Sequence, residues 1–214
     1  MSSLATLGGL IALHLTGTTF NVASGVGFIA LEDMLDLGIT GPMLRAAGLK
    51  VDARKDNPYS SYEKFEFEVP TRTDNDVFSR YQVRIEEMRQ STRIIKQAME
   101  GMPAGPWKAD APHVVLPDRE KMKTQIEALI YHFKIVTEGF RVPEGEVYQV
   151  IESPRGELGY YVVSDGTTHP YRVHMRTPSF GNLQATPTIV EGILIADVIA
   201  SLGSMDFVLG DTDR

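Results

Sequence analysis

Charged side chains gather in the carboxy-terminal third of the sequence, at positions where they could build a polar site. The set comprises Glu152, Arg155, Glu157, Arg172, Arg176 and Asp206. The first three fall in a turn between predicted strands, and Asp206 follows an apolar helix. Arg172 and Arg176 lie four residues apart on a predicted strand and therefore share one face of it. Exposed ion pairs would contribute little to stability. At the edge of a core, the same charges would need oppositely charged partners, and such clusters are often functional sites.

The sequence offers little support for other kinds of chemistry. It has no cysteine, so disulfides, thiol catalysis and cysteine ligation of metals are excluded. None of the histidines shows the HExxH spacing, and we expect each to be structural or on the surface; they are His14, His113, His132, His169 and His174. No GxGxxG, Walker A or GxSxG motif is present, which gives no support to nucleotide binding or to a serine nucleophile.

Hydrophobic periodicity predicts the elements that must position these charges. A period of two predicts strands at 147–151, 158–163 and 171–175. Helical spacing predicts a long helix over about 76–101, with Asp74 as its N-cap. Its expected buried face consists of Val77, Tyr81, Ile85, Met88, Ile95 and Met99. The arginines and glutamates on its other faces are expected to be solvated, with a polar subunit contact as the alternative.

Two further helices are predicted, one before the strands and one after them. A helix over 118–137 should bury Met122, Ile126, Leu129, Ile130 and Phe133. A last helix begins near Pro187 and continues to Leu202, and it is apolar on most faces, which is typical of a core or an interface. Together these patterns predict an α+β fold, mainly a helical bundle with a small antiparallel sheet.

Composition favours an ordinary globular protein. The 214 residues include 28 acidic and 21 basic side chains, giving a net charge of −7, which argues against nucleic acid as the main partner. Residues 1–24 belong to an apolar, uncharged stretch with many glycines and polar residues. We interpret that stretch as buried structure, with a membrane span as the weaker alternative.

Several stretches of the sequence resemble the D subunit of NADH-quinone oxidoreductase, which is the quinone-site subunit of respiratory complex I. The resemblance is colinear over 25–214, which we treat as one domain, and more distantly it extends to the large subunit of nickel–iron hydrogenase. It is carried by GITGPMLR at 38–45, YQVRIEEMRQSTRIIKQ at 81–97, EALIYHFKIVTEGF at 127–140, GEVY at 145–148, ESPRGELGYYVVSDG at 152–166, PYRVHMRTPSFGNL at 170–183 and the terminal Asp-Arg.

The resemblance implies a fold like the hydrogenase large subunit and a role in electron transfer from NADH to quinone, coupled to proton translocation. It implies that Asp206, Val208, Arg155 and Arg214 lie near the quinone cavity and the terminal iron–sulfur cluster, with Glu152, Glu157, Arg172 and Arg176 as a supporting polar cluster. No cofactor or metal would be bound by this chain. The iron–sulfur cluster would belong to a partner protein of the complex, and this chain would lie peripherally at the cytoplasmic face of the cell membrane.

The sequence departs from this family at its amino-terminal end. Residues 1–24 lack the histidine- and tyrosine-bearing strand motif that binds the quinone head group in the family, and His14 does not match it. The chain looks like the carboxy-terminal half of a family member. We therefore expect a subunit without independent activity, and a truncated, non-catalytic structural or assembly homologue remains the alternative.

Overall fold

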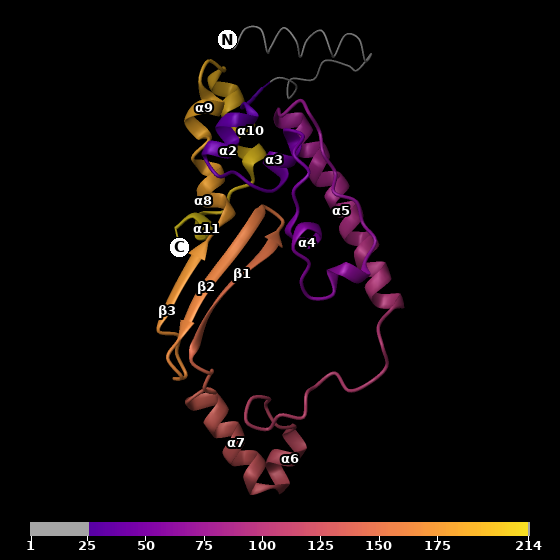
Figure 1. Cartoon of the computed structure of the whole chain (residues 1–214), viewed down its shortest axis with the longest axis vertical. Helices are drawn as coiled ribbons and strands as arrows, with labels where there is room; N and C mark the ends of the chain where they lie inside the picture. The colour runs from indigo at the N-terminus through magenta and orange to yellow at the C-terminus, as the bar shows by residue number, and fades with distance from the viewer. Residues whose placement is uncertain (1–25, 214) are drawn as a thin grey trace. The chain divides into compact units, whose positions relative to one another are not determined.

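The computed structural model describes residues 26–213 and shows an α+β fold (Figure 1). The predicted segment 1–24, His14 and Arg214 lie outside the described residues. The helices and strands are, in chain order, α2 (Leu31–Asp36), α3 (Pro42–Ala46), α4 (Ala53–Asp56), the 3-10 helix η1 (Tyr62–Lys64), α5 (Val77–Glu100), α6 (Arg119–Thr124), α7 (Ile126–Thr137), β1 (Gly145–Ser153), β2 (Gly156–Ser164), β3 (Arg172–Arg176), α8 (Pro178–Leu183), α9 (Thr186–Val190), α10 (Ile195–Met205) and α11 (Leu209–Thr212). Among the described helices, none is long and apolar enough to cross a membrane.

The three predicted strands form one antiparallel sheet in the order β1-β2-β3, which confirms the α+β prediction. Strands β1 and β2 are joined by only two residues, Pro154 and Arg155. A connection this short requires antiparallel neighbours, because parallel strands need a crossover of a dozen or more residues. The hydrogenase-like nature of the fold stays a prediction.

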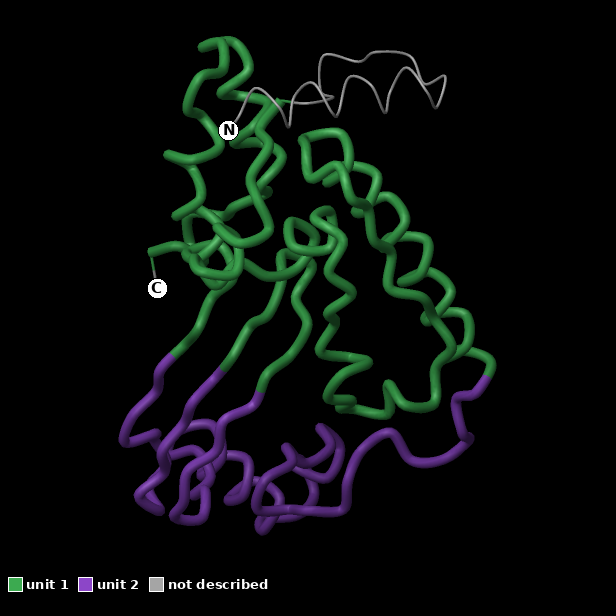
Figure 2. The backbone as a smooth tube through the Cα atoms, turned by 45° about the horizontal axis from the view of Figure 1, so that its top comes forward, with its two compact units in different colours: residues 1–100, 150–159, 175–214 green, residues 101–149, 160–174 purple. Residues whose placement is uncertain are grey.

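The chain divides into two compact units, coloured separately in Figure 2. The described part of unit 1 contains residues 26–100, 150–159 and 175–213, and unit 2 contains residues 101–149 and 160–174. The boundary cuts each of the three strands. Of the six charged residues that the sequence gathers into a polar site, all belong to unit 1 except Arg172.

Unit 1 has a hydrophobic core built from short helices far apart in the sequence. Its buried members are Ile29, Met34, Ile39, Met43, Leu44, Ala185, Ile189 and Met205. They join α2 and α3 to α9 and the end of α10. The short helices α2 and α3 are each followed by a glycine in the left-handed region, Gly38 and Gly48, as helix termini commonly are.

Helix α5 confirms the predicted long helix, but its N-cap differs from the prediction. Asp76, rather than Asp74, caps it: the Ser79 backbone N–H donates to Asp76 Oδ1 at 2.7 Å, and the Asp76 N–H donates to Ser79 Oγ at 2.9 Å. This reciprocal pair satisfies two backbone donors at the helix start.

The prediction of which face of α5 is buried was wrong. The buried side chains are Ser79, Arg80 and Val83, whereas Tyr81 and Ile95 on the predicted face are each 58% exposed. The reason is that α5 packs against α3 and α10, and these two helices present polar partners to it. Arginines expected to be solvated therefore lie inside unit 1.

The two remaining helix predictions also need correction. The helix predicted over 118–137 is broken at Gln125 into α6 and α7. Its buried hydrophobic residue is Ala128, while Ile126, Leu129, Ile130 and Phe133 are exposed. The predicted last helix is likewise two helices, α9 and α10, because Gly192 between them adopts a φ of +79°. Ile195 and Ile199 of α10 are exposed, so core does not surround this helix.

Candidate functional site

Arg155 and Asp206 meet in unit 1, as a site built from both residues requires. Arg155 belongs to the two-residue turn between β1 and β2, and its Nε donates to the backbone carbonyl of Asp206 at 2.7 Å. The same nitrogen lies 3.8 Å from Asp206 Oδ2. The Asp206 side chain is 47% exposed, so the pair is open to solvent on one side.

Asp206 occupies an unusual backbone conformation at the end of α10. It is the C-cap residue of that helix, with φ 53° and ψ 39°, and its N–H donates to the Gly203 carbonyl at 3.2 Å. Few residues other than glycine adopt this left-handed conformation, and aspartate is among the better tolerated. The conformation turns the chain sharply and leads it away from the helix axis.

The segment after Asp206 exposes apolar side chains that follow this ion pair closely in the sequence. Val208 is 40% exposed, and Leu209, the first residue of α11, is exposed as well. The segment is tied to α8, since the Val208 N–H donates to Ser179 Oγ at 3.4 Å and the Ser179 N–H donates to Asp211 Oδ2 at 3.1 Å. The segment therefore carries both a charged residue, Asp206, and exposed apolar residues, and two hydrogen bonds hold it to α8.

Glu152 lies in a buried ionic network that the sequence did not predict. Arg45 of α3, whose side chain is only 2% exposed, is its centre. Arg45 Nε contacts Glu87 Oε1 at 2.6 Å, and Arg45 Nη1 contacts Glu152 Oε1 at 2.9 Å. The other oxygen of Glu152 accepts from the Ala53 N–H at 3.1 Å, so this carboxylate also anchors the start of α4.

Burial and the neighbouring charges have opposite effects on the pKa values of the groups in this network. Burial raises the pKa of both Glu87 and Glu152, because desolvation of the carboxylates outweighs the attraction of Arg45. Burial opposes the charge of Arg45 as well, but its acidic neighbours outweigh that effect and raise the pKa of Arg45. The Arg45 guanidinium therefore stays charged, and the carboxylates of Glu87 and Glu152 are the groups whose charged form is disfavoured by burial.

Arg80 of α5, which is fully buried, and Arg84, which is partly buried, are two further cations missed by the sequence prediction. Burial lowers the pKa of Arg80 to about 10, so it is still protonated at neutral pH. Its guanidinium donates to Ser204 Oγ at 2.6 Å, and also to the Gly27 carbonyl. Burial likewise lowers the pKa of Arg84, against the opposing effects of Asp206 and Glu87. Arg84 thus lies within electrostatic reach of both the Asp206 pair and the Arg45 network.

The remaining residues of the predicted cluster, Glu157, Arg172 and Arg176, make no ion pair with Arg155, Asp206 or Arg45 among the described residues. Glu157 pairs with Arg176, with 3.2 Å between Oε1 and Nη1, and Arg176 Nη2 also donates to the Gly38 carbonyl at 3.2 Å. Arg172 is exposed and belongs to unit 2. Sharing a strand face therefore did not bring Arg172 and Arg176 into one buried cluster.

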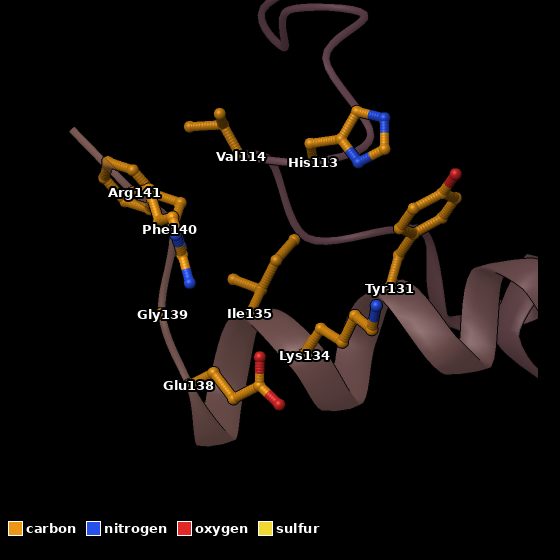
Figure 3. Close-up of a pocket in the computed structure, with 9 residues that line it drawn as sticks. All are labelled: His113, Val114, Tyr131, Lys134, Ile135, Glu138, Gly139, Phe140 and Arg141. Atoms are coloured by element: carbon orange, nitrogen blue, oxygen red, sulfur yellow. The ribbon is translucent and has the colours of Figure 1, made fainter. Parts of the chain in front are cut away.

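Unit 2 contains a separate pocket of about 400 Å³. It lies between the α7 helix and the segments on either side of it, and its lining residues are His113, Val114, Tyr131, Lys134, Ile135, Glu138, Gly139, Phe140 and Arg141 (Figure 3). The rings of His113 and Tyr131 meet edge to face, with 4.8 Å between their centroids. No residue of the predicted site lines this pocket.

The comparisons with known proteins identify the class to which this fold and site belong. The family model described as the 49 Kd subunit of respiratory-chain NADH dehydrogenase matches residues 18–214, and the chain belongs to that family. The chain is 90% identical over 190 residues to the NADH-quinone oxidoreductase D subunit numbered 1 of Solibacter usitatus, a match covering 89% of this chain and 46% of that protein.

Less similar relatives carry the same name and match over a similar share of the chain. The NADH-quinone oxidoreductase D subunit of Geotalea uraniireducens is 54% identical over 89% of this chain and 49% of its own length. The corresponding protein of Saccharopolyspora erythraea is 52% identical over 88% of this chain and 46% of its own length. The chain therefore spans about half the length of the curated relatives it matches.

Proposed function

We propose that this chain forms part of the quinone-site subunit of an NADH:quinone oxidoreductase. Its relatives are subunits of that oxidoreductase, which supports assembly of the chain with other complex I subunits. In the proposed role, an iron–sulfur cluster held by a partner protein delivers two electrons, and quinone takes up two protons to become quinol. The chain binds no redox cofactor itself and lies peripherally at the cytoplasmic face of the membrane, and quinone reduction by the complex is coupled to proton translocation.

The observation that carries the proposal is the surface formed by Arg155, Asp206 and Val208. A quinone has a polar head with two carbonyl acceptors and an apolar tail, so its cavity needs a few oriented polar groups in an apolar wall. Arg155 supplies N–H donors beside Asp206, and Val208 and Leu209 supply exposed apolar surface. In the assembled complex this surface would form part of the cavity wall.

Each residue has a distinct part in this proposal. Arg155 donates to a quinone carbonyl oxygen through its other N–H groups, since within residues 26–213 only its Nε makes a side-chain hydrogen bond, to the Asp206 carbonyl. Asp206 holds the guanidinium in place and balances its charge. Val208 packs against the ring or the first part of the tail.

The test is Asp206→Asn, introduced into the subunit in its membrane complex. The expected result is about a tenfold or greater loss of quinone reductase turnover, because the amide keeps the backbone carbonyl but removes the negative charge that lies 3.8 Å from Arg155 Nε and balances the guanidinium. Electron transfer from NADH to an artificial acceptor that bypasses quinone should be unchanged. Asp36→Asn is the matched control, since Asp36 is an exposed carboxylate on α2 of the same unit.

An assembled Asp206→Asn complex with full quinone turnover would contradict the proposal. That result would favour a purely structural role for the Asp206 segment, which is the role of a non-catalytic homologue.

A further inference from the structure

The turn that carries Arg155 is held by a contact between two backbone segments far apart in the sequence. Gly41 precedes α3 with a φ of +75°, and Gly156 begins β2 with a φ of +137°. A Cβ atom added to Gly41 would lie 2.5 Å from both the Arg155 carbonyl oxygen and the Gly156 Cα. The two glycines therefore allow the backbones to approach more closely than any side chain would permit.

Thr40 and Asn182 complete this contact with hydrogen bonds. The Glu157 N–H donates to Thr40 Oγ1 at 3.0 Å. Asn182 of α8 is 1% exposed and serves both segments: its Oδ1 accepts from the Thr40 N–H at 3.4 Å, and its Nδ2 donates to the Arg155 carbonyl at 3.2 Å. The backbone from the Arg155 carbonyl to the Glu157 N–H is thus held by the buried Asn182 and the half-buried Thr40.

Thr40, Gly41 and Asn182 act on the backbone from which the Arg155 side chain begins, rather than on Asp206 itself. Arg155 contacts Asp206 through a single nitrogen at 2.7 Å. A hydrogen bond weakens steeply when its distance or angle changes. A displacement of the turn by an ångström would therefore separate Arg155 from Asp206.

We propose that Thr40, Gly41 and Asn182 are positioning residues that seat the 154–157 turn and so bring Arg155 to Asp206 at the quinone wall. The second half of this statement rests on the proposed function. The first half, the seating of the turn, is independent of it and can be measured without quinone.

The decisive variant is Gly41→Ala. The added methyl group meets backbone atoms, which cannot rotate away, so the turn must move. Gly192→Ala is the matched control: Gly192 has nearly the same φ, +79°, but a Cβ there meets nothing within 4 Å. Both variants place an alanine at a positive φ, and only in Gly41→Ala does the new methyl group meet backbone atoms of the turn.

The position of the turn can be read from a pair of spin labels in the full chain. The natural sequence has no cysteine, so Pro154→Cys and Leu209→Cys give two unique labelling sites, both at exposed positions. The distance between the labels should shift or broaden in Gly41→Ala and stay unchanged in Gly192→Ala. An unchanged distance in Gly41→Ala, or equal changes in the two variants, would overturn the seating of the turn.

The effect on the reaction is measured in the membrane complex with a short-chain quinone. Gly41→Ala should lower kcat/KM for quinone about tenfold and leave NADH oxidation with a bypassing acceptor intact, while Gly192→Ala should match the natural complex. Thr40→Val should also lower kcat/KM, by a smaller factor. Thr40→Ser keeps the Oγ atom and should retain the natural kcat/KM. Thr40→Val therefore tests the proposal even if Gly41→Ala fails to assemble.

The two proposals fail in different ways. If Asp206→Asn lowers quinone turnover but Gly41→Ala and Thr40→Val do not, the positioning role is overturned. If all three leave turnover unchanged while the spin-label distance moves, the turn is seated as described but the quinone function is wrong.

Discussion

Arg45 shows how a single residue can carry information that pattern analysis overlooks. It lies in the short helix Pro42–Ala46, where all five residues are buried. A lone charge within a buried apolar helix must find a partner, because an unpaired buried charge is very costly. That reasoning predicts a buried acid near Arg45, although it cannot name Glu87 or Glu152, which lie 42 and 107 residues away.

Removing this charge should be among the most destabilising substitutions in unit 1. Arg45→Ala leaves Glu87 and Glu152 buried without their cation, and breaking such a pair costs about 3–5 kcal/mol. The free energy of unfolding of the full chain, measured by urea titration with circular dichroism, should fall by that amount. Arg89→Ala, which removes an exposed partner of Glu86, should change it little. Similar losses in both variants would refute the assignment of a buried network.

At the scale of elements, the sequence predicted positions better than orientations. The three strands and helix α5 lie where the periodicity placed them, because period two and period 3.6 follow from local backbone geometry. Which face is buried depends on what lies opposite. For α5 the opposing elements are α3 and α10, and they bring polar groups such as Ser204 that pair with Arg80.

The reversed burial of α5 can be tested with two substitutions on the same helix. Val83 is fully buried and Ile95 is exposed. Val83→Ala should lower the free energy of unfolding by about 2 kcal/mol, because it removes two methyl groups from a packed site. Ile95→Ala should have little effect, although the sequence pattern alone assigns Ile95 to the core. In urea titrations of the full chain, a larger loss of unfolding free energy for Ile95→Ala than for Val83→Ala would support the face of α5 that the sequence pattern predicts to be buried.

At the scale of the whole molecule, part of the candidate site followed from the sequence and part did not. Asp206, Val208 and Arg155 were found through the resemblance, and the structure brings Arg155 to Asp206. Arg80, Arg84 and Glu87 of α5 were missed because charges on a long helix are usually solvated, and Arg45 was missed because its helix α3 is too short to show a periodic pattern. Their burial arises from contacts between elements that are distant in the chain, and such contacts leave no local periodic signal.

The exposure of Trp107 in unit 2 has a spectroscopic consequence. The single tryptophan of the sequence, Trp107, belongs to unit 2 and is 92% exposed. Its fluorescence in the folded chain should resemble that of free indole in water, should be fully accessible to acrylamide, and should change little during urea unfolding. Circular dichroism recorded on the same samples should show the full transition. A blue-shifted emission that moves to the red on unfolding would show that Trp107 is covered.

The contact at Gly41 also bears on how the chain acquires its structure during synthesis. Thr40 leaves the ribosome before its partners Glu157 and Asn182, which follow 117 and 142 residues later. Domains tend to fold as units during translation, so the polar groups of the loop before α3 stay in water until those partners have been synthesised. Contacts of such long sequence separation slow folding. Seating of the Arg155 turn against Thr40 and Asn182 is therefore expected late in folding, after the local helices of unit 1 have formed.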